Sequence, residues 1–193
     1  MSATDFQLEE RGEVRVVRLQ SQDATNRLTR NFVLSLTDAI ARLARDRRPI
    51  VLAGNEKFFC AGADLQEIFT LDASSAYEFS GIGQTLMNAV DQFPAPVYAA
   101  VEGYCMGGGL DLALACDHRV ASPNAVFGHR GAALGLITGW GGTQRLPRLL
   151  GKGRALQMFV AAETIMAPQA LDIGLVDTIA ADPLAEAIRC LEQ

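Results

Sequence analysis

The stretch PVYAAVEGYCMGGGLDLALACDHRVAS, residues 96–122, decides the fold class of this 193-residue chain. Its apolar run Val97–Val101 predicts a buried strand, Gly107–Gly109 predicts a loop, and Leu110–Cys116 predicts an apolar helix. Glycines between a strand and a helix let the backbone approach a ligand, because unpaired amides at the helix start point outward. Taken alone, the glycines fit a closely packed turn better than an anion site, but both interpretations predict a layered α/β structure.

The strand, loop and helix order of this stretch also occurs earlier in the chain. Glu13–Leu19 predicts a strand that leads into a helix over Leu28–Arg45. Ile50–Ala53 predicts a second buried strand, which is followed by a loop and by a helix over about 74–93. The repetition favours an α/β domain built of similar units.

Short strands and then helices follow in the second half of the chain. Strands are predicted at His118–Ala121 and near Val126, and helices over Gly141–Leu150, Arg154–Ala162 and Pro183–Leu191. The chain contains no tandem repeat of constant period and no long linker, so we expect one domain.

The composition excludes several classes of function. Lys and Arg number 17 against 22 Asp and Glu, so the net charge is −5 and no basic surplus is available for a nucleic-acid backbone. The N-terminus lacks an apolar secretory segment, and no run approaches the roughly 18 apolar residues of a membrane span. We therefore expect a cytoplasmic protein that binds a small molecule and has neither a nucleic-acid nor a membrane partner.

The four cysteines predict neither a disulfide framework nor a metal site. Cys60, Cys105, Cys116 and Cys190 have no CxxC spacing and no histidine pair nearby. We expect reduced, mostly packed thiols and no bound metal.

A second glycine-containing loop changes the interpretation of the first. FFCAGADL, residues 58–65, also follows a strand and can offer the amide of Ala63 toward the same place as the glycines at 107–109. Two converging amides form an oxyanion hole, and losing one donor typically costs about 10²–10³ in rate. The pair predicts chemistry at a carbonyl or a thioester.

Four segments, in this order, resemble signatures of the enoyl-CoA hydratase/isomerase, or crotonase, superfamily. They are FFCAGADL (58–65), PVYAAVEGYCMGGGLDLALACDHRVAS (96–122), LGLITGWGGTQRLPRLLGKGRAL (134–156) and ALDIGLVD (170–177), and Asn26–Leu28 is similar to an early family turn. The resemblance implies a crotonase-like spiral of repeated ββα units with short C-terminal helices, forming a single domain over 1–193. We expect a spiral core over about 1–140 and a helical part over about 141–193, which is shorter than is usual in the family.

The resemblance also implies a binding site and an assembly. The oxyanion amides fall on Ala63 and Gly108, and an acyl-CoA thioester is the substrate, with no permanently bound cofactor. The further substrate contacts that we expect are Cys60, Ala61, Asp64, Leu65, Gly107 and Trp140. A purely packed position is the alternative for the tryptophan. The family implies a homo-oligomer, either a trimer or a hexamer.

The acid and base groups depart from the hydratase pattern. The first family glutamate, three residues beyond the second oxyanion glycine, is Asp111 here, and the second, twenty residues later, is Gly131. Hydration needs one group to deprotonate water and another to protonate the α carbon, and glycine does neither. Asp111 is the predicted catalytic residue, with a carboxylate that favours a helix N-terminus as the alternative. His129, a base near pH 7 when neutral, is a further catalytic candidate beside a packing role.

These residues leave three functions open. The first is an acyl-CoA lyase or isomerase of fatty-acid metabolism, with hydration of a 2-enoyl-CoA as the expected reaction. Loss of the second carboxylate favours decarboxylation or double-bond isomerisation, which proceed through the same enolate with fewer acid and base groups. Gly131 and the short C-terminus also fit an acyl-CoA-binding protein with little catalysis.

Overall fold

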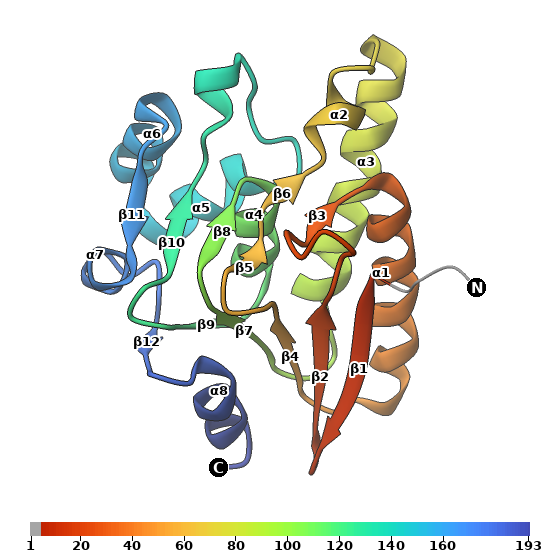
Figure 1. Ribbon diagram of the computed structural model, residues 1–193, viewed down its shortest axis with the longest axis vertical. Coiled ribbons are helices and arrows are strands. Elements are labelled where there is room, and N and C mark those ends of the chain that lie inside the picture. The colour runs from red at the N-terminus through yellow and green to blue at the C-terminus, as the bar shows by residue number, and fades with distance from the viewer. Residues whose placement is uncertain (1–4) are drawn as a thin grey trace.

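The computed structural model describes residues 5–193 and shows two larger sheets with helices packed around them (Figure 1). One sheet has the strand order β1-β2-β4-β7-β9-β12, in which β1 and β2 are antiparallel and the following neighbours are parallel. Its strands are β1 (Phe6–Arg11), β2 (Val14–Leu19), β4 (Ile50–Ala53), β7 (Val97–Val101), β9 (His118–Ala121) and β12 (Thr178–Ile179).

The second sheet has the order β11-β10-β8-β5, and β3 and β6 form a short parallel pair beside it. These strands are β3 (Arg27–Leu28), β5 (Phe58–Cys60), β6 (Gly62–Ala63), β8 (Tyr104–Met106), β10 (Val126–Gly128) and β11 (Thr164–Met166). The helices are α1 (Arg30–Leu43), α2 (Leu65–Ile68), α3 (Ala73–Asp91), α4 (Gly108–Ala115), α5 (Gly142–Leu150), α6 (Lys152–Ala161), α7 (Ala167–Asp172) and α8 (Pro183–Leu191).

The chain winds as a spiral of repeated ββα units. In the units β4-β5-α3, β7-β8-α4 and β9-β10-α5, the first strand joins the larger sheet and the second joins the smaller one (Figure 1). Successive turns therefore stack strand on strand in both sheets, with parallel pairing between equivalent strands. The predicted crotonase-like α/β spiral is confirmed.

The two faces of the larger sheet pack against different elements. Val14 and Val16 of β2 lie on the face that α8 covers with Ala187, whereas Val17 lies on the opposite face, in the main core with α1. This division follows from the alternation of side chains along a strand. The helix α8 thus covers the outer face of the sheet, and α1, α3 and α4 lie on its inner face.

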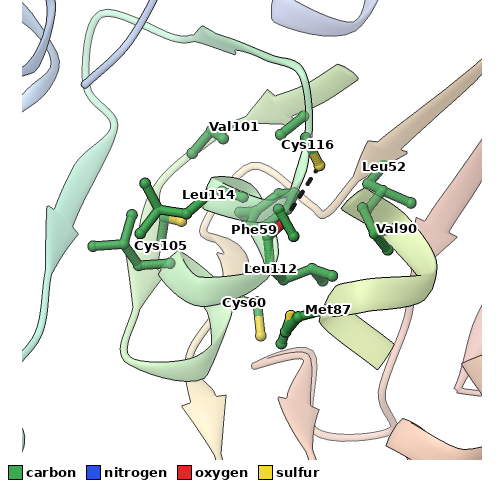
Figure 2. Packing of buried hydrophobic residues seen from close by; sticks show 14 of the residues in the cluster. Leu52, Phe59, Cys60, Met87, Val90, Val101, Cys105, Leu112, Leu114 and Cys116 are labelled. Atoms are coloured by element: carbon green, nitrogen blue, oxygen red, sulfur yellow. Dashed lines mark hydrogen bonds between the residues drawn. The ribbon is translucent and has the colours of Figure 1, made fainter. Parts of the chain in front are cut away.

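Helix α4 lies at the centre of the core, and each of its residues is buried. A helix that is apolar on every side is stable only where other elements surround it. Figure 2 shows Leu112 of α4 close to Phe59 of β5 and to Met87 and Val90 of α3. At the end of the helix, the Cys116 thiol donates to the Leu112 carbonyl at 3.4 Å. The position of α4 fixes the site at its N-terminus.

Most predicted elements are confirmed, with shifts of a few residues at their ends. Helix α1 begins at Arg30 rather than at Leu28, because the Thr29 hydroxyl accepts the Phe32 N–H at 3.2 Å. The strands β1, β3, β5, β6, β8, β11 and β12 are not among the predicted elements. All of them except β1 are two or three residues long, which is too short to carry an alternation pattern. Within residues 5–193, no helix is both long and apolar enough to cross a membrane.

Three of the four cysteines are buried in the core, and Cys190 is half-buried on α8. Burial raises the pKa of the Cys60 and Cys116 thiols to about 12, and it raises the pKa of Cys105 well above its ordinary value. The three buried thiols therefore stay protonated at neutral pH.

We expect an aromatic disulfide reagent at pH 8 to modify Cys190 and to leave the three buried cysteines unmodified in the folded protein. A thiol with a pKa near 12 is only about one part in ten thousand thiolate at pH 8, and the thiolate is the nucleophile. The measurement is the number of thiols titrated before and after denaturation, with Cys190→Ser as the control. Rapid labelling of Cys60 in native protein would contradict the buried packing.

Candidate active site

The two glycine-containing loops meet at the N-terminus of α4. A methyl group built on Gly62 would lie 2.7 Å from the Met106 carbonyl oxygen and 3.1 Å from the Gly108 nitrogen. A methyl group built on Gly108 would lie 3.3 Å from the Ala63 nitrogen. Backbone atoms of the two loops therefore approach one another as closely as glycine allows, and this brings the Ala63 and Gly108 amides side by side.

Neither the Ala63 N–H nor the Gly108 N–H takes part in the regular hydrogen bonds of its own strand pair or helix. The N–H of Asp64 donates to the Leu28 carbonyl of β3 at 3.3 Å, so the preceding N–H of Ala63 points to the opposite edge of β6. Gly108 is the first residue of α4, where an amide has no acceptor within the helix. Gly107, at φ +51°, adopts a backbone conformation that favours glycine and turns the chain from β8 into α4.

A cavity of about 420 Å³ opens in front of these amides. This volume lies within the range of sites for small organic ligands. Apolar side chains from α2, α3 and the loop before α5 form most of its wall, among them Leu65, Ile68, Phe79, Leu134, Ile137 and Trp140. The cavity is suited to an apolar chain attached to a polar group at the two amides.

The buried polar groups of the cavity are Asp111 and His129. Asp111 lies one helical turn beyond Gly108, and its side chain is 1% exposed. Its Oδ1 lies 3.2 Å from Nε2 of His129, which follows β10. This distance is within ion-pair range, but the alignment does not make a hydrogen bond, so both atoms lack one within the described residues. The imidazole ring packs against Phe159, with ring centroids 5.1 Å apart.

Two residues that sequence reasoning missed complete this arrangement. The Thr138 hydroxyl donates to Oδ2 of Asp111. A methyl group built on Gly142, the first residue of α5, would lie 2.2 Å from Oδ1 of Asp111 and 3.0 Å from Nε2 of His129. In the sequence, these two residues are a threonine and the second glycine of a pair, within the family-like segment at 134–156. Neither residue type shows by itself that the residue contacts Asp111.

Gly131 lies in the short 3₁₀ turn Gly131–Leu134 at the cavity wall. A methyl group there would lie 2.8 Å from the Leu136 carbonyl oxygen, which is backbone and cannot rotate away. The backbone of this turn thus leaves no space for a side chain at residue 131, which is the position of the second family glutamate.

Trp140 is both packed and part of the cavity wall. Its indole N–H donates to the Phe79 carbonyl at 3.2 Å, and the two rings lie 5.2 Å apart. A methyl group on Gly108 would lie 2.6 Å from Cζ3 of this indole, and one on Gly83 of α3 would lie 2.1 Å from its Nε1. The tryptophan is held between α3 and the first residue of α4.

The remaining predicted contacts divide into two groups. Ala61, Leu65 and Gly107 line the cavity. Cys60 and Asp64 are absent from its wall: the Cys60 thiol donates to the Asn26 carbonyl at 2.9 Å, and Asp64 caps α2 by accepting the Gln66 N–H at 2.8 Å. Within residues 5–193, no group of three or more His, Cys, Asp or Glu side chains is arranged to hold a metal ion.

Comparison with known families places this chain in a class of proteins. The sequence profile of the enoyl-CoA hydratase/isomerase family matches residues 9–193, which is nearly the whole chain. The chain belongs to the enoyl-CoA hydratase/isomerase family, within the crotonase superfamily.

Two bacterial relatives are similar to this chain over 70% of their own length. Crotonyl-CoA hydratase of Syntrophomonas wolfei and short-chain-enoyl-CoA hydratase of Clostridium acetobutylicum are each 37% identical over 182 residues, covering 93% of this chain and 70% of the relative. The crystal structure of enoyl-CoA hydratase from Bacillus anthracis matches with a TM-score of 0.92 at 33% identity, covering 97% of this chain and 75% of that one. DspI of Pseudomonas aeruginosa matches with a TM-score of 0.93 at 34% identity, covering 98% and 74%.

We expect Gly108→Ala to lower the free energy of unfolding by about 1–3 kcal/mol, because the added methyl overlaps the indole of Trp140. Gly81→Ala is the matched control, since Gly81 lies exposed on α3 with no atom within 4 Å of a built methyl. The control should gain about 0.5–1 kcal/mol from helix propensity. Urea unfolding measures both, and equal stability of Gly108→Ala and the native protein would contradict the close contact.

Proposed function

We propose that this protein acts on an acyl-CoA thioester as an enoyl-CoA hydratase-like enzyme that stabilises an enolate between the Ala63 and Gly108 amides. The observation that carries the proposal is the pair of adjacent, outward-pointing amides at a cavity that also contains Asp111. Donors fixed before the reaction stabilise developing charge without reorganisation, which is the largest contribution in many enzymes. The relatives named crotonyl-CoA and short-chain-enoyl-CoA hydratase support the same substrate class.

In hydration, the oxygen of water bonds to the β carbon of a 2-enoyl thioester, and the electrons of the double bond move onto the thioester oxygen. The amides of Ala63 and Gly108 hold the resulting negative charge. Asp111 accepts a proton from the water, and a proton is then delivered to the α carbon as the thioester carbonyl reforms. The sum is addition of one water molecule across the double bond.

This reaction needs two groups that can hold a proton, and in our proposal these are the buried side chains of Asp111 and His129. Oδ1 of Asp111 and Nε2 of His129 lie 3.2 Å apart at the cavity wall. In the reaction that we propose, a small rotation of the imidazole aligns these two atoms and a proton passes between them, so His129 serves in place of the carboxylate that is missing at Gly131. Asp111 lies one turn beyond the oxyanion glycine Gly108 along α4.

Double-bond isomerisation is the second candidate, and the geometry of Gly131 favours it. Moving a proton between the α and γ carbons of an enoyl thioester passes through the same enolate and can use a single carboxylate. The turn at Gly131 has no room for a second one, since a methyl there would lie 2.8 Å from the Leu136 oxygen. Decarboxylation shares the enolate as well, but no residue of the cavity specifically favours it.

Membership of the family also supports a proposal about the location, the oligomeric state and the substrate of the enzyme. We propose a cytoplasmic enzyme of fatty-acid metabolism that works as a homo-oligomer, a trimer or a hexamer, and uses a coenzyme A thioester as substrate without a permanently bound cofactor. The expected substrate contacts are those that line the cavity beside the oxyanion amides, namely Ala61, Leu65, Gly107 and Trp140.

We expect Asp111→Asn to lower hydration of crotonyl-CoA by about 10²-fold or more, because the amide neither accepts the proton of water nor returns one. Exchange of the α protons of butyryl-CoA in D₂O, followed by mass spectrometry, should fall equally, since it requires only enolate formation. Asp38→Asn, on the exposed side of α1, is the control.

The outcomes separate the hypotheses. Exchange without hydration would move the function to isomerisation, which a β,γ-enoyl thioester then tests directly. Tight binding of CoA thioesters with neither reaction would show an acyl-CoA-binding protein and contradict the enzyme proposal.

We expect Gly131→Glu to leave hydration no faster and to lower the free energy of unfolding by about 1–3 kcal/mol, because its Cβ presses on the Leu136 carbonyl. Gly153→Glu on α6 is the matched control, since no atom lies within 4 Å of a methyl built there. Hydration of crotonyl-CoA and urea unfolding are the measurements. A tenfold gain in hydration by Gly131→Glu would show that the turn does accept a second carboxylate.

A further inference from the structure

Thr138 lies in the loop between the 3₁₀ turn and α5, where its hydroxyl has a partner on each side. It donates to Oδ2 of Asp111 and accepts the backbone N–H of Trp140 at 3.4 Å. A hydroxyl has one proton, and the N–H of Trp140 faces its lone pairs, so the proton is directed to the carboxylate. The carboxylate therefore receives a hydrogen bond at one defined oxygen.

This bond decides what the other oxygen of Asp111 contacts. With Oδ2 held by Thr138, Oδ1 faces Nε2 of His129 at 3.2 Å, and both of these buried atoms lack an aligned hydrogen bond within the described residues. Leaving a buried polar atom without a partner costs about 1–3 kcal/mol. Buried polar atoms without a hydrogen bond are few in native structures, and a catalytic role is one of the explanations for them.

The space around the pair is kept open by Gly142. A methyl group there would lie 2.8 Å from Cγ2 of Thr138 as well as 2.2 Å from Oδ1 of Asp111. The threonine methyl therefore packs against the start of α5, and this contact restricts rotation of the side chain that carries the hydroxyl. Thr138 is held in place from both sides.

We propose that Thr138 is a positioning residue: its hydroxyl fixes the Asp111 carboxylate so that Oδ1, and not Oδ2, faces His129 and exchanges protons with it. This inference rests on the proposed function for its kinetic consequence, but the geometry that it asserts can be tested without turnover. The role that we propose for Thr138 is exerted through the Asp111 carboxylate.

The kinetic experiment compares Thr138→Val, which keeps the shape and removes the hydroxyl, with Thr138→Ser, which keeps the hydroxyl. We expect Thr138→Val to lower kcat for crotonyl-CoA about 10- to 100-fold, the effect of losing a hydrogen bond to a charged group. KM should stay within about threefold, because binding at the amides is unaffected. Thr138→Ser should recover most of kcat, and Thr85→Val, exposed on α3, is the control.

The second readout is ¹⁵N NMR of protein labelled at histidine. The chain has two histidines, and His118, which lies 3.6 Å from Asp177 at the surface, provides an internal reference. In Thr138→Val the His129 ring resonances should shift while those of His118 stay, and in Thr138→Ser both should match the native protein. If Thr138→Val does not fold, Thr138→Ala is measured in the same way.

The outcomes distinguish the two proposals. Unchanged kcat or unchanged His129 resonances in folded Thr138→Val would overturn the positioning role. If the native protein turns over no enoyl thioester, the proposed function fails, and the histidine resonances alone then decide whether Thr138 fixes the carboxylate.

Discussion

The close approach of two backbone segments at the start of α4 is the constraint on which the site depends. Gly62, Gly108 and Gly109 lie where a Cβ would come within 2.5–2.7 Å of atoms in the facing loop, the facing strand or the indole. Larger residues at these positions would push the loop of β6 away from α4. The separation of the Ala63 and Gly108 amides is therefore a consequence of packing in the buried core, because α4 is surrounded by other elements and cannot move independently.

The acid and base groups of the site come from three segments that lie far apart in sequence. Asp111 comes from α4, His129 from the end of β10, and Thr138 from the loop before α5. Their side chains meet because the spiral brings the ends of successive units to the same side of the core. In the mechanism that we propose, the backbone of the fold supplies the oxyanion amides, and these individual side chains supply the groups that move protons.

Much of the fold could be predicted from the sequence, because local patterns indicate strands, loops and helices. Contacts between residues that are distant in sequence could not be predicted in this way. Val97–Val101 and the glycines after it predict a strand and a loop by themselves, and the position of Ala63 follows from a second loop of the same kind. The contact between Thr138 and Asp111 joins residues 27 apart, and no periodicity indicates it. Cys60 was expected at the substrate but lies beneath the loop, because burial and a hydrogen bond to Asn26 turn its thiol inward.

The clamping of Trp140 between Gly83 and Gly108 has an experimental consequence of its own. It is the single tryptophan of the chain, and its ring touches the residue whose amide we assign to the thioester oxygen. The protein thus carries an intrinsic fluorophore in the wall of the cavity. Occupation of the site changes the polarity beside this indole, so its emission is an optical signal for ligand binding that needs no label and no turnover.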